Sequence, residues 1–99
     1  MAEATVRFHP DAAEEAESAY DWYAARNPAA ADAFRDELRH AVDAVVQNPL
    51  TWPRYARGTR RDVFLRFPFS LVYRMRGDDV EVLAVAHGRR RPGYWRSRQ

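Results

Sequence analysis

The chain has 99 residues, which is the length of one domain with one modest hydrophobic core. It contains no cysteine, which excludes a disulfide framework and thiolate metal sites and favours a reducing compartment. The first ten residues show no basic stretch followed by an apolar run, and the longest apolar run is the short Val-Leu-Ala-Val-Ala at residues 82–86. We therefore expect no signal peptide and no membrane span, but a cytoplasmic protein.

The charges are divided unevenly between the two halves of the chain. Residues 1–50 hold four arginines and ten acidic residues, whereas residues 51–99 hold twelve arginines and four acidic residues. Every basic residue is arginine, whose planar fork binds phosphate and carboxylate groups. A compositional bias is an alternative explanation for the absence of lysine, but it does not explain the segregation. The pattern predicts an acidic face and a basic face, and the basic face would attract a polyanion or an acidic peptide.

The first half of the chain reads as one short strand followed by two helices. Residues 4–9 alternate apolar and polar side chains, which predicts a strand, and Pro10 suits the first turn of a helix. The helical pattern then breaks, because Asn27 suits an N-cap and Pro28 the first position of a second helix that ends near Asn48. Helices joined by so short a connection are expected to form an antiparallel hairpin.

The second half of the chain, after a proline-rich loop at residues 49–59, predicts three strands. These strands are expected at residues 60–67, 69–76 and 80–87, with a Gly-Asp-Asp turn between the last two. The last strand is apolar on both sides, which predicts a central position. The resulting order is β-α-α-β-β-β. It predicts an α+β fold in which the helical hairpin packs on one face of a small, mainly antiparallel sheet.

The alternation within these strands predicts which side chains share a face. In the first of them, Val63, Leu65 and Phe67 lie together, and we expect them on the side of the helices. The opposite face, which no predicted element covers, is then expected to carry Phe64, Arg66, Arg74 and Arg76. Because several arginines gather there without a covering element, this face is a candidate binding surface.

The order and spacing of these segments resemble the RelE/ParE superfamily of bacterial type II toxins over nearly the whole chain. The resemblance rests on FHPDAAEEAESAYDWYAARNP, ADAFRDELRHAVDAVVQNP and LRFPFSLVYRMRGDDVEVLAVAHGRR. A strand–turn–strand unit that ends in His-Gly-Arg-Arg is typical of ParE-like members, so this branch is favoured. The resemblance implies a single toxin domain over residues 1–99, of the plasmid-stabilisation type. It also implies a cognate antitoxin whose acidic segment covers the basic face.

Two mechanisms divide the superfamily, and the residues leave both open. ParE-like members bind and inhibit DNA gyrase, whereas RelE-like members cleave mRNA in the ribosomal A site. Ser70 stands where the family often places an arginine, and Gly88 where some nucleases have an aromatic residue. These departures favour a non-enzymatic toxin over a metal-independent endoribonuclease. A degenerate module that binds an antitoxin without being toxic is a third interpretation.

Candidate site residues come mainly from the second half of the chain. RNA cleavage without a metal needs a base, an acid and a cation at the phosphate. The candidates for these roles are His87, Tyr94, Arg74 and Arg66. The candidates for contact with a target or an antitoxin are Arg61, Arg76, Arg89, Arg90, Arg91 and Trp95. No histidine spacing suggests a metal site and no glycine-rich phosphate loop is present, so we expect neither a metal nor a cofactor.

Each of these assignments has a simpler alternative. His87 stands at the end of a predicted strand, where it would also serve as a local hydrogen-bonding residue. Tyr94 and Trp95 are expected to dock on the helices or to meet a partner protein rather than to stack on RNA. The arginine-rich C-terminus is interpreted as part of the interaction surface, and the alternative is a frayed, solvated end.

Overall fold

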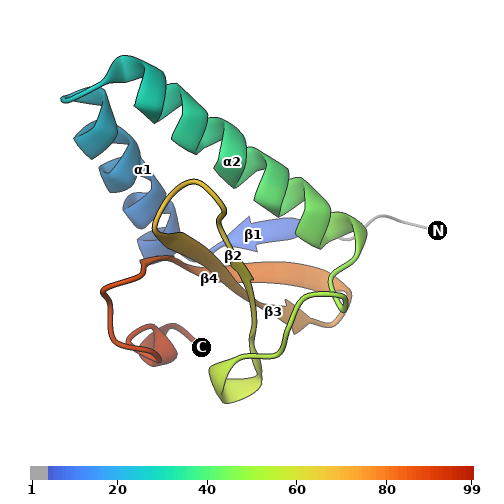
Figure 1. Cartoon of the computed structure of the whole chain (residues 1–99). Helices are drawn as coiled ribbons and strands as arrows, with labels where there is room; N and C mark the ends of the chain where they lie inside the picture. Colours follow the sequence, from blue (N-terminus) through green and yellow to red (C-terminus); the bar gives the residue numbers. More distant parts are fainter. Residues whose placement is uncertain (1–4) are drawn as a thin grey trace.

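The computed structural model describes residues 5–99, and its elements follow the predicted order (Figure 1). They are β1 (Val6–Phe8), α1 (Pro10–Ala24), α2 (Pro28–Gln47), β2 (Arg60–Val63), β3 (Phe69–Arg76) and β4 (Asp79–His87), with short 3₁₀ turns at Ala56–Gly58 and Arg96–Arg98. The sheet order is β1-β4-β3-β2; β1 runs parallel to β4, and the other neighbours are antiparallel. The predicted α+β fold and the central position of the last strand are confirmed. Residue 4 of the predicted first strand lies outside the described residues.

The helix boundaries arise from side chains that cap them, as the sequence predicts. The Nδ1 atom of His9 accepts the backbone N–H of Asp11 at 3.1 Å, and a proline begins α1. Asn27 caps α2, because its Oδ1 atom accepts the N–H groups of Ala29 and Ala30 at 3.1 and 3.4 Å. Within residues 5–99, neither helix is long and apolar enough to cross a membrane.

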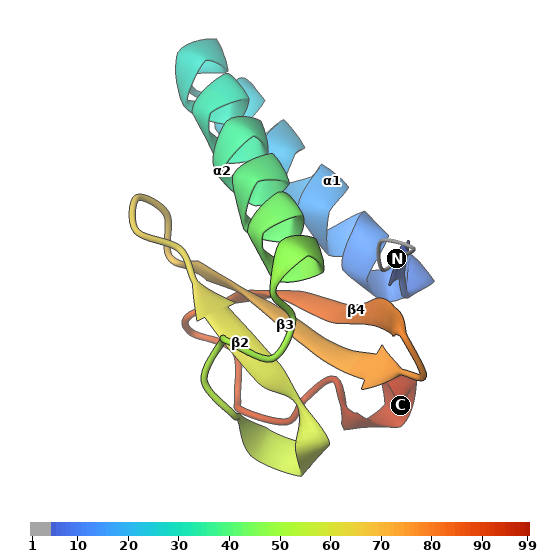
Figure 2. The ribbon, with the colours of Figure 1, turned by 90° about the vertical axis from the view of Figure 1, so that its right-hand side faces the viewer.

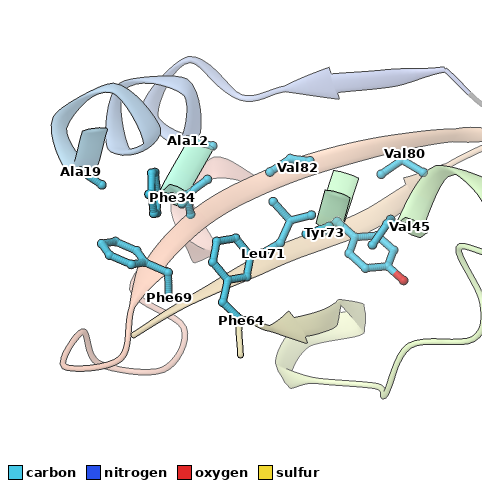
Figure 3. Close-up of a cluster of buried hydrophobic side chains, with 12 residues drawn as sticks. Ala12, Ala19, Phe34, Val45, Phe64, Phe69, Leu71, Tyr73, Val80 and Val82 are labelled. Atoms are coloured by element: carbon cyan, nitrogen blue, oxygen red, sulfur yellow. The ribbon is translucent and has the colours of Figure 1, made fainter. Parts of the chain in front are cut away.

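The helical hairpin covers one face of the sheet and forms the main core with it (Figure 3). Phe34 of α2 is 1% exposed and lies at the centre of an aromatic cluster. Its ring lies 5.2 to 6.3 Å from those of Tyr23, Phe64, Phe67 and Phe69, mostly in edge or tilted arrangements. Such ring pairs are favourable beyond the area they bury, so this cluster anchors the hairpin to the sheet.

The first strand of the meander differs from the prediction. It ends at Val63, and Phe64 is buried in the main core while Val63 and Leu65 are 56% and 96% exposed. The reason is the pairing register, since Asp62 lies opposite the core residue Leu71. Asp62 and Phe64 therefore face the helices, and the predicted assignment of Val63 and Leu65 to the core side is wrong.

The sheet face opposite the helices is also different from the prediction, because it is covered. Residues 88–99, called here the C-terminal segment, fold across it (Figure 2). The pairing of β3 with β4 skips Leu83, which is a β-bulge, and both Leu83 and Ala84 belong to the cluster on this face. Trp95 packs against them and against Val72 and is 1% exposed. The C-terminus is therefore a folded element, not a frayed end.

Candidate functional site

A groove of about 820 Å³ lies between α1 and the C-terminal segment. We call it the α1 groove. It is lined by Asp11, Glu14, Glu15, Ser18, Ala19, Trp22, Tyr23, Pro68, Phe69, Val85, His87, Arg90, Tyr94 and Arg98. Its floor is aromatic and aliphatic, one wall carries carboxylates of α1, and the other carries basic groups. An apolar floor with few polar groups at its rim is typical of a site for a small molecule or a peptide segment.

Glu15 of α1 connects three parts of the molecule at the bottom of this groove. Its carboxylate accepts the backbone N–H of Val85 at 3.1 Å and two N–H groups of Arg98 at 2.8 and 3.1 Å. Arg98 in turn donates to the carbonyl oxygen of Leu83 at 2.9 Å. The short strand β1 stops pairing with β4 at Val82. Beyond that point, the side chains of Glu15 and Arg98 bond to the backbone N–H and C=O groups at this edge of β4, which would otherwise have no partner strand. The C-terminal segment is thereby held against α1.

Tyr94 completes this network and is docked on the helices, one of the two placements expected from the sequence. Its hydroxyl donates to Glu15 at 2.6 Å. Burial, together with this hydrogen bond, raises the pKa of the Tyr94 phenol well above its usual value, although Arg98 and Arg90 lower it in part. The hydrogen bond joins the phenol to α1 and helps to hold the C-terminal segment in place.

His87 lies at the rim of the α1 groove and makes local contacts. Its Nδ1 atom accepts the backbone N–H of Arg89 at 3.0 Å, which leaves Nε2 as the protonated nitrogen of the neutral ring. Its ring stands edge-on to Phe69 at 5.1 Å between centroids. The geometry matches a strand-end histidine that hydrogen-bonds locally.

The two predicted phosphate clamps do not lie near His87. Arg74 is on the opposite face of the sheet, where its Nε atom donates to Glu81 at 2.7 Å. Glu81 precedes His87 by six residues on β4, a separation of roughly 20 Å along a strand. Arg66 is exposed in the β2–β3 connection, where its backbone N–H bonds to Glu37 of α2. The four nuclease candidates therefore do not converge on one point.

Three of the predicted partner-binding residues do lie together. Arg61, Arg90 and Arg91 line a small hollow of about 130 Å³ with Ser70 and part of the C-terminal segment. The guanidinium carbon of Arg61 lies 4.1 Å from the centroid of the Tyr55 ring, which orients the side chain. We call Arg61, Arg89, Arg90 and Arg91 the arginine cluster; Arg89 does not line the hollow, but it is exposed and directly precedes Arg90 in the sequence.

Of the two remaining candidates, Arg76 lies elsewhere, and Trp95 borders the same small hollow but is buried. Arg76 is exposed at the far end of β3, 3.6 Å from Glu81. Trp95 is buried under the C-terminal segment, so its indole ring has no free surface for a partner while the segment is docked. The prediction of one continuous, uncovered arginine face is wrong because the β-bulge creates an apolar patch that Trp95 covers.

Glu15 and Arg98 are central to the groove and were not among the predicted site residues. A signal for Glu15 was present, because it shares the spacing of Ala12, Ala16 and Ala19 on the buried side of α1. An acidic residue at a core-facing position needs a partner. The sequence gives no comparable signal for Arg98, which is one of five arginines after residue 88.

Comparisons with known proteins agree with this architecture. Residues 6–92 match the family model described as ParE toxin of type II toxin-antitoxin system, parDE. A solved structure of the chromosomal ParDE TA system from P. aeruginosa has a TM-score of 0.75 to this chain at 21% sequence identity. The match covers 86% of this chain and 96% of that chain. The comparison with curated protein sequences gave no match.

Proposed function

Because the chain belongs to the ParE toxin family of type II toxin–antitoxin systems, we propose that it inhibits growth by binding a protein target such as DNA gyrase. The observation that carries this proposal is the separation of the nuclease candidates. Arg74 is paired with Glu81 on one face of the sheet, and His87 lies on the other face at the opposite end of β4. General acid–base cleavage needs its groups within hydrogen-bond reach of one scissile phosphate. A binding mechanism needs no such convergence.

A cognate antitoxin is proposed to neutralise the toxin by docking an extended segment at the α1 groove and the arginine cluster. The groove offers Tyr23, Phe69 and Val85 as an apolar floor for the antitoxin's apolar side chains. The adjoining arginines offer exposed guanidinium groups for acidic side chains. Charge pairs across such a surface increase the association rate and fix the register of an extended peptide.

Two assays run in parallel distinguish inhibition of gyrase from cleavage of mRNA. In the first, purified protein is added to a DNA supercoiling reaction; in the second, it is added to a translation extract, and ribosome-bound mRNA is mapped. We expect loss of supercoiling and intact mRNA. Cleavage that disappears in His87→Ala or Arg74→Ala variants that still fold would instead support the endoribonuclease alternative, and an unaffected supercoiling reaction would exclude gyrase as the target.

Toxicity and neutralisation are tested in cells. Induced expression of the chain alone is expected to arrest growth, and co-expression of the protein encoded by the neighbouring reading frame is expected to restore it. Growth that continues with intact, folded protein would support the alternative of a degenerate module that binds an antitoxin without being toxic. A purified complex of the two proteins would then still form.

A further inference from the structure

A third hollow, of about 470 Å³, lies where the loop after α2 folds against β3. It exists because β2 starts pairing with β3 at Tyr73, so the following residues of β3 have no strand beside them on that edge. An isolated bridge between Arg54 and Arg60 brings the loop alongside. The hollow is lined by Leu50, Arg54, Tyr55, Gly58, Thr59, Arg60, Tyr73, Arg74 and Met75.

Three arginines from three different segments line this hollow, and none of its lining residues is acidic. Arg60 is held in place by a hydrogen bond from one terminal nitrogen to the carbonyl oxygen of Trp52 at 2.7 Å. Arg74 is held by its Nε atom on Glu81, which leaves both of its terminal nitrogens without a hydrogen bond among residues 5–99. Arg54 makes no side-chain hydrogen bond or ion pair within the same part of the chain. Arg60 and Arg74 are therefore oriented by hydrogen bonds, whereas Arg54 is not. The carboxylate of Glu81 lies on Arg74, and that of Asp62 lies close enough to Tyr73 to raise the pKa of its phenol.

The hollow also has an apolar side, formed by Leu50, Met75 and the ring of Tyr73. Leu50 is 68% exposed, so its side chain has free apolar surface. The ring of Tyr73 is fully buried, with its hydroxyl donating to the carbonyl oxygen of Pro49, so Leu50 and half-buried Met75 carry the apolar surface that a ligand can reach. A volume in this range matches sites for small organic ligands.

From this combination we propose that the hollow binds a nucleoside 5′-phosphate group. Guanidinium forks suit the tetrahedral oxygens of phosphate by paired N–H···O bonds, and the apolar side suits a flat base. The phosphate belongs either to a free mononucleotide or to the 5′ end of a nucleic acid strand, which present the same chemistry. The site shares no residue with the α1 groove and only Tyr55 with the hollow of the arginine cluster, and none of the arginines that line it belongs to that cluster, so phosphate binding there does not require the proposed docking of an antitoxin or a target.

The test is a titration in which NMR chemical shifts of the backbone amides of the folded protein are measured. The ligands are adenosine 5′-monophosphate, adenosine, and one oligonucleotide with and without a 5′-phosphate. We expect shifts at residues 54–60 and 73–75 with the monophosphate and none with adenosine. Tighter binding of the 5′-phosphorylated strand than of the monophosphate assigns the site to strand ends. Equal or weaker binding assigns it to free nucleotides.

The matched variants are Arg54→Ala and Arg76→Ala, since both remove one exposed arginine and only Arg54 lines the hollow. We expect affinity for the monophosphate to fall roughly tenfold or more in Arg54→Ala, as for a lost charged hydrogen bond, and to change little in Arg76→Ala. Arg54→Lys, which keeps the charge without the fork, is expected to lie between wild type and Arg54→Ala. Absence of any phosphate-dependent shift, equal weakening in both alanine variants, or shifts confined to residues 89–91 would overturn the proposal.

Discussion

The hydroxyl of Tyr94 donates a hydrogen bond to the carboxylate of Glu15 across 2.6 Å and thereby joins the C-terminal segment to the first helix. The same carboxylate pairs with Arg98, whose side chain is only 12% exposed. The residues that bond to Glu15 thus lie 70 or more positions further along the chain, and the groove beside α1 depends on this carboxylate for its shape.

Replacement of Glu15 by alanine is expected to destabilise the fold. It leaves the N–H of Val85, the hydroxyl of Tyr94 and the guanidinium of Arg98 without their acceptor, so the free energy of unfolding should fall by about 2–4 kcal/mol. Urea unfolding measures the loss. The control is Glu17→Ala, an exposed position on the same helix, which should change stability by less than about 0.5 kcal/mol. Equal losses in the two variants would contradict the role given to Glu15.

Stability is expected to fall at alkaline pH because burial raises the pKa of three tyrosines, Tyr23, Tyr73 and Tyr94, and the last two show the larger effect. Burial raises the pKa of Tyr73 to about 12, and burial with the Glu15 hydrogen bond raises the pKa of Tyr94 further. Both phenols are protonated in either state below pH 10, so their stabilising effect is complete there. Above about pH 10 the unfolded phenols ionise while the folded ones do not, and unfolding releases protons. Stability should therefore decrease as pH rises above 10, by up to about 1.4 kcal/mol per pH unit for each group.

The measurement for this prediction is the free energy of unfolding from urea titrations between pH 8 and 11.5. Tyr94→Phe removes one of these ionisations, so its curve should descend less steeply than that of the wild type. A wild-type curve that stays level from pH 9 to 11 would show that these phenols ionise as easily in the folded chain as in the unfolded one.

Trp95 and Trp22 form a natural comparison. Trp95 is 1% exposed beneath the C-terminal segment, whereas Trp22 is 54% exposed on α1. Trp95→Ala should reduce the free energy of unfolding by about 3–5 kcal/mol, since it leaves a large cavity, and Trp22→Ala by less than about 1 kcal/mol. Chemical denaturation of both variants is the measurement. If they lose the same amount, the covered sheet face described above is not the stable arrangement.

A pair of adjacent residues tests the pairing register of β2. Phe64 is 6% exposed in the aromatic cluster, and Leu65 is 96% exposed. Phe64→Ala should therefore reduce the free energy of unfolding by about 3–5 kcal/mol, while Leu65→Ala should leave it nearly unchanged. Thermal or urea unfolding decides between this register and the one expected from strand alternation alone, which predicts the reverse order.

The same pair shows what the sequence could and could not predict about the fold. Helix caps such as Asn27 act within a few residues, so the residue type and its neighbours were sufficient to locate α2. The face of a strand depends instead on its register with another strand, and a shift of one residue reverses it. Phe64 and Leu65 are both apolar, so alternation alone did not decide which of them faces the helices.

The site was harder to predict because it is built from contacts distant in sequence. The arginines were identified by residue type, but their partners were not: Arg98 bonds to Glu15 and Leu83, and Arg74 bonds to Glu81. An arginine whose terminal nitrogens are held by an internal carboxylate, such as Arg98, is part of the scaffold, whereas one whose terminal nitrogens stay free is available to a ligand. That distinction needs coordinates, and it separates the arginine cluster from the arginines that hold the C-terminal segment.

Charge reversal in the arginine cluster is expected to slow association with the antitoxin, if the proposed docking is correct. Arg91 is exposed, and its replacement leaves Arg90 in place over the ring of Tyr94 at 3.9 Å, so the C-terminal segment should stay folded. Arg91→Glu should lower the association rate roughly threefold to tenfold at low ionic strength, with a smaller effect as salt screens the charges. The control is Arg39→Glu on α2, which makes the same change in net charge away from the groove. Stopped-flow association at two salt concentrations measures both, and equal effects of the two substitutions would show that only net charge, not this surface, steers the antitoxin.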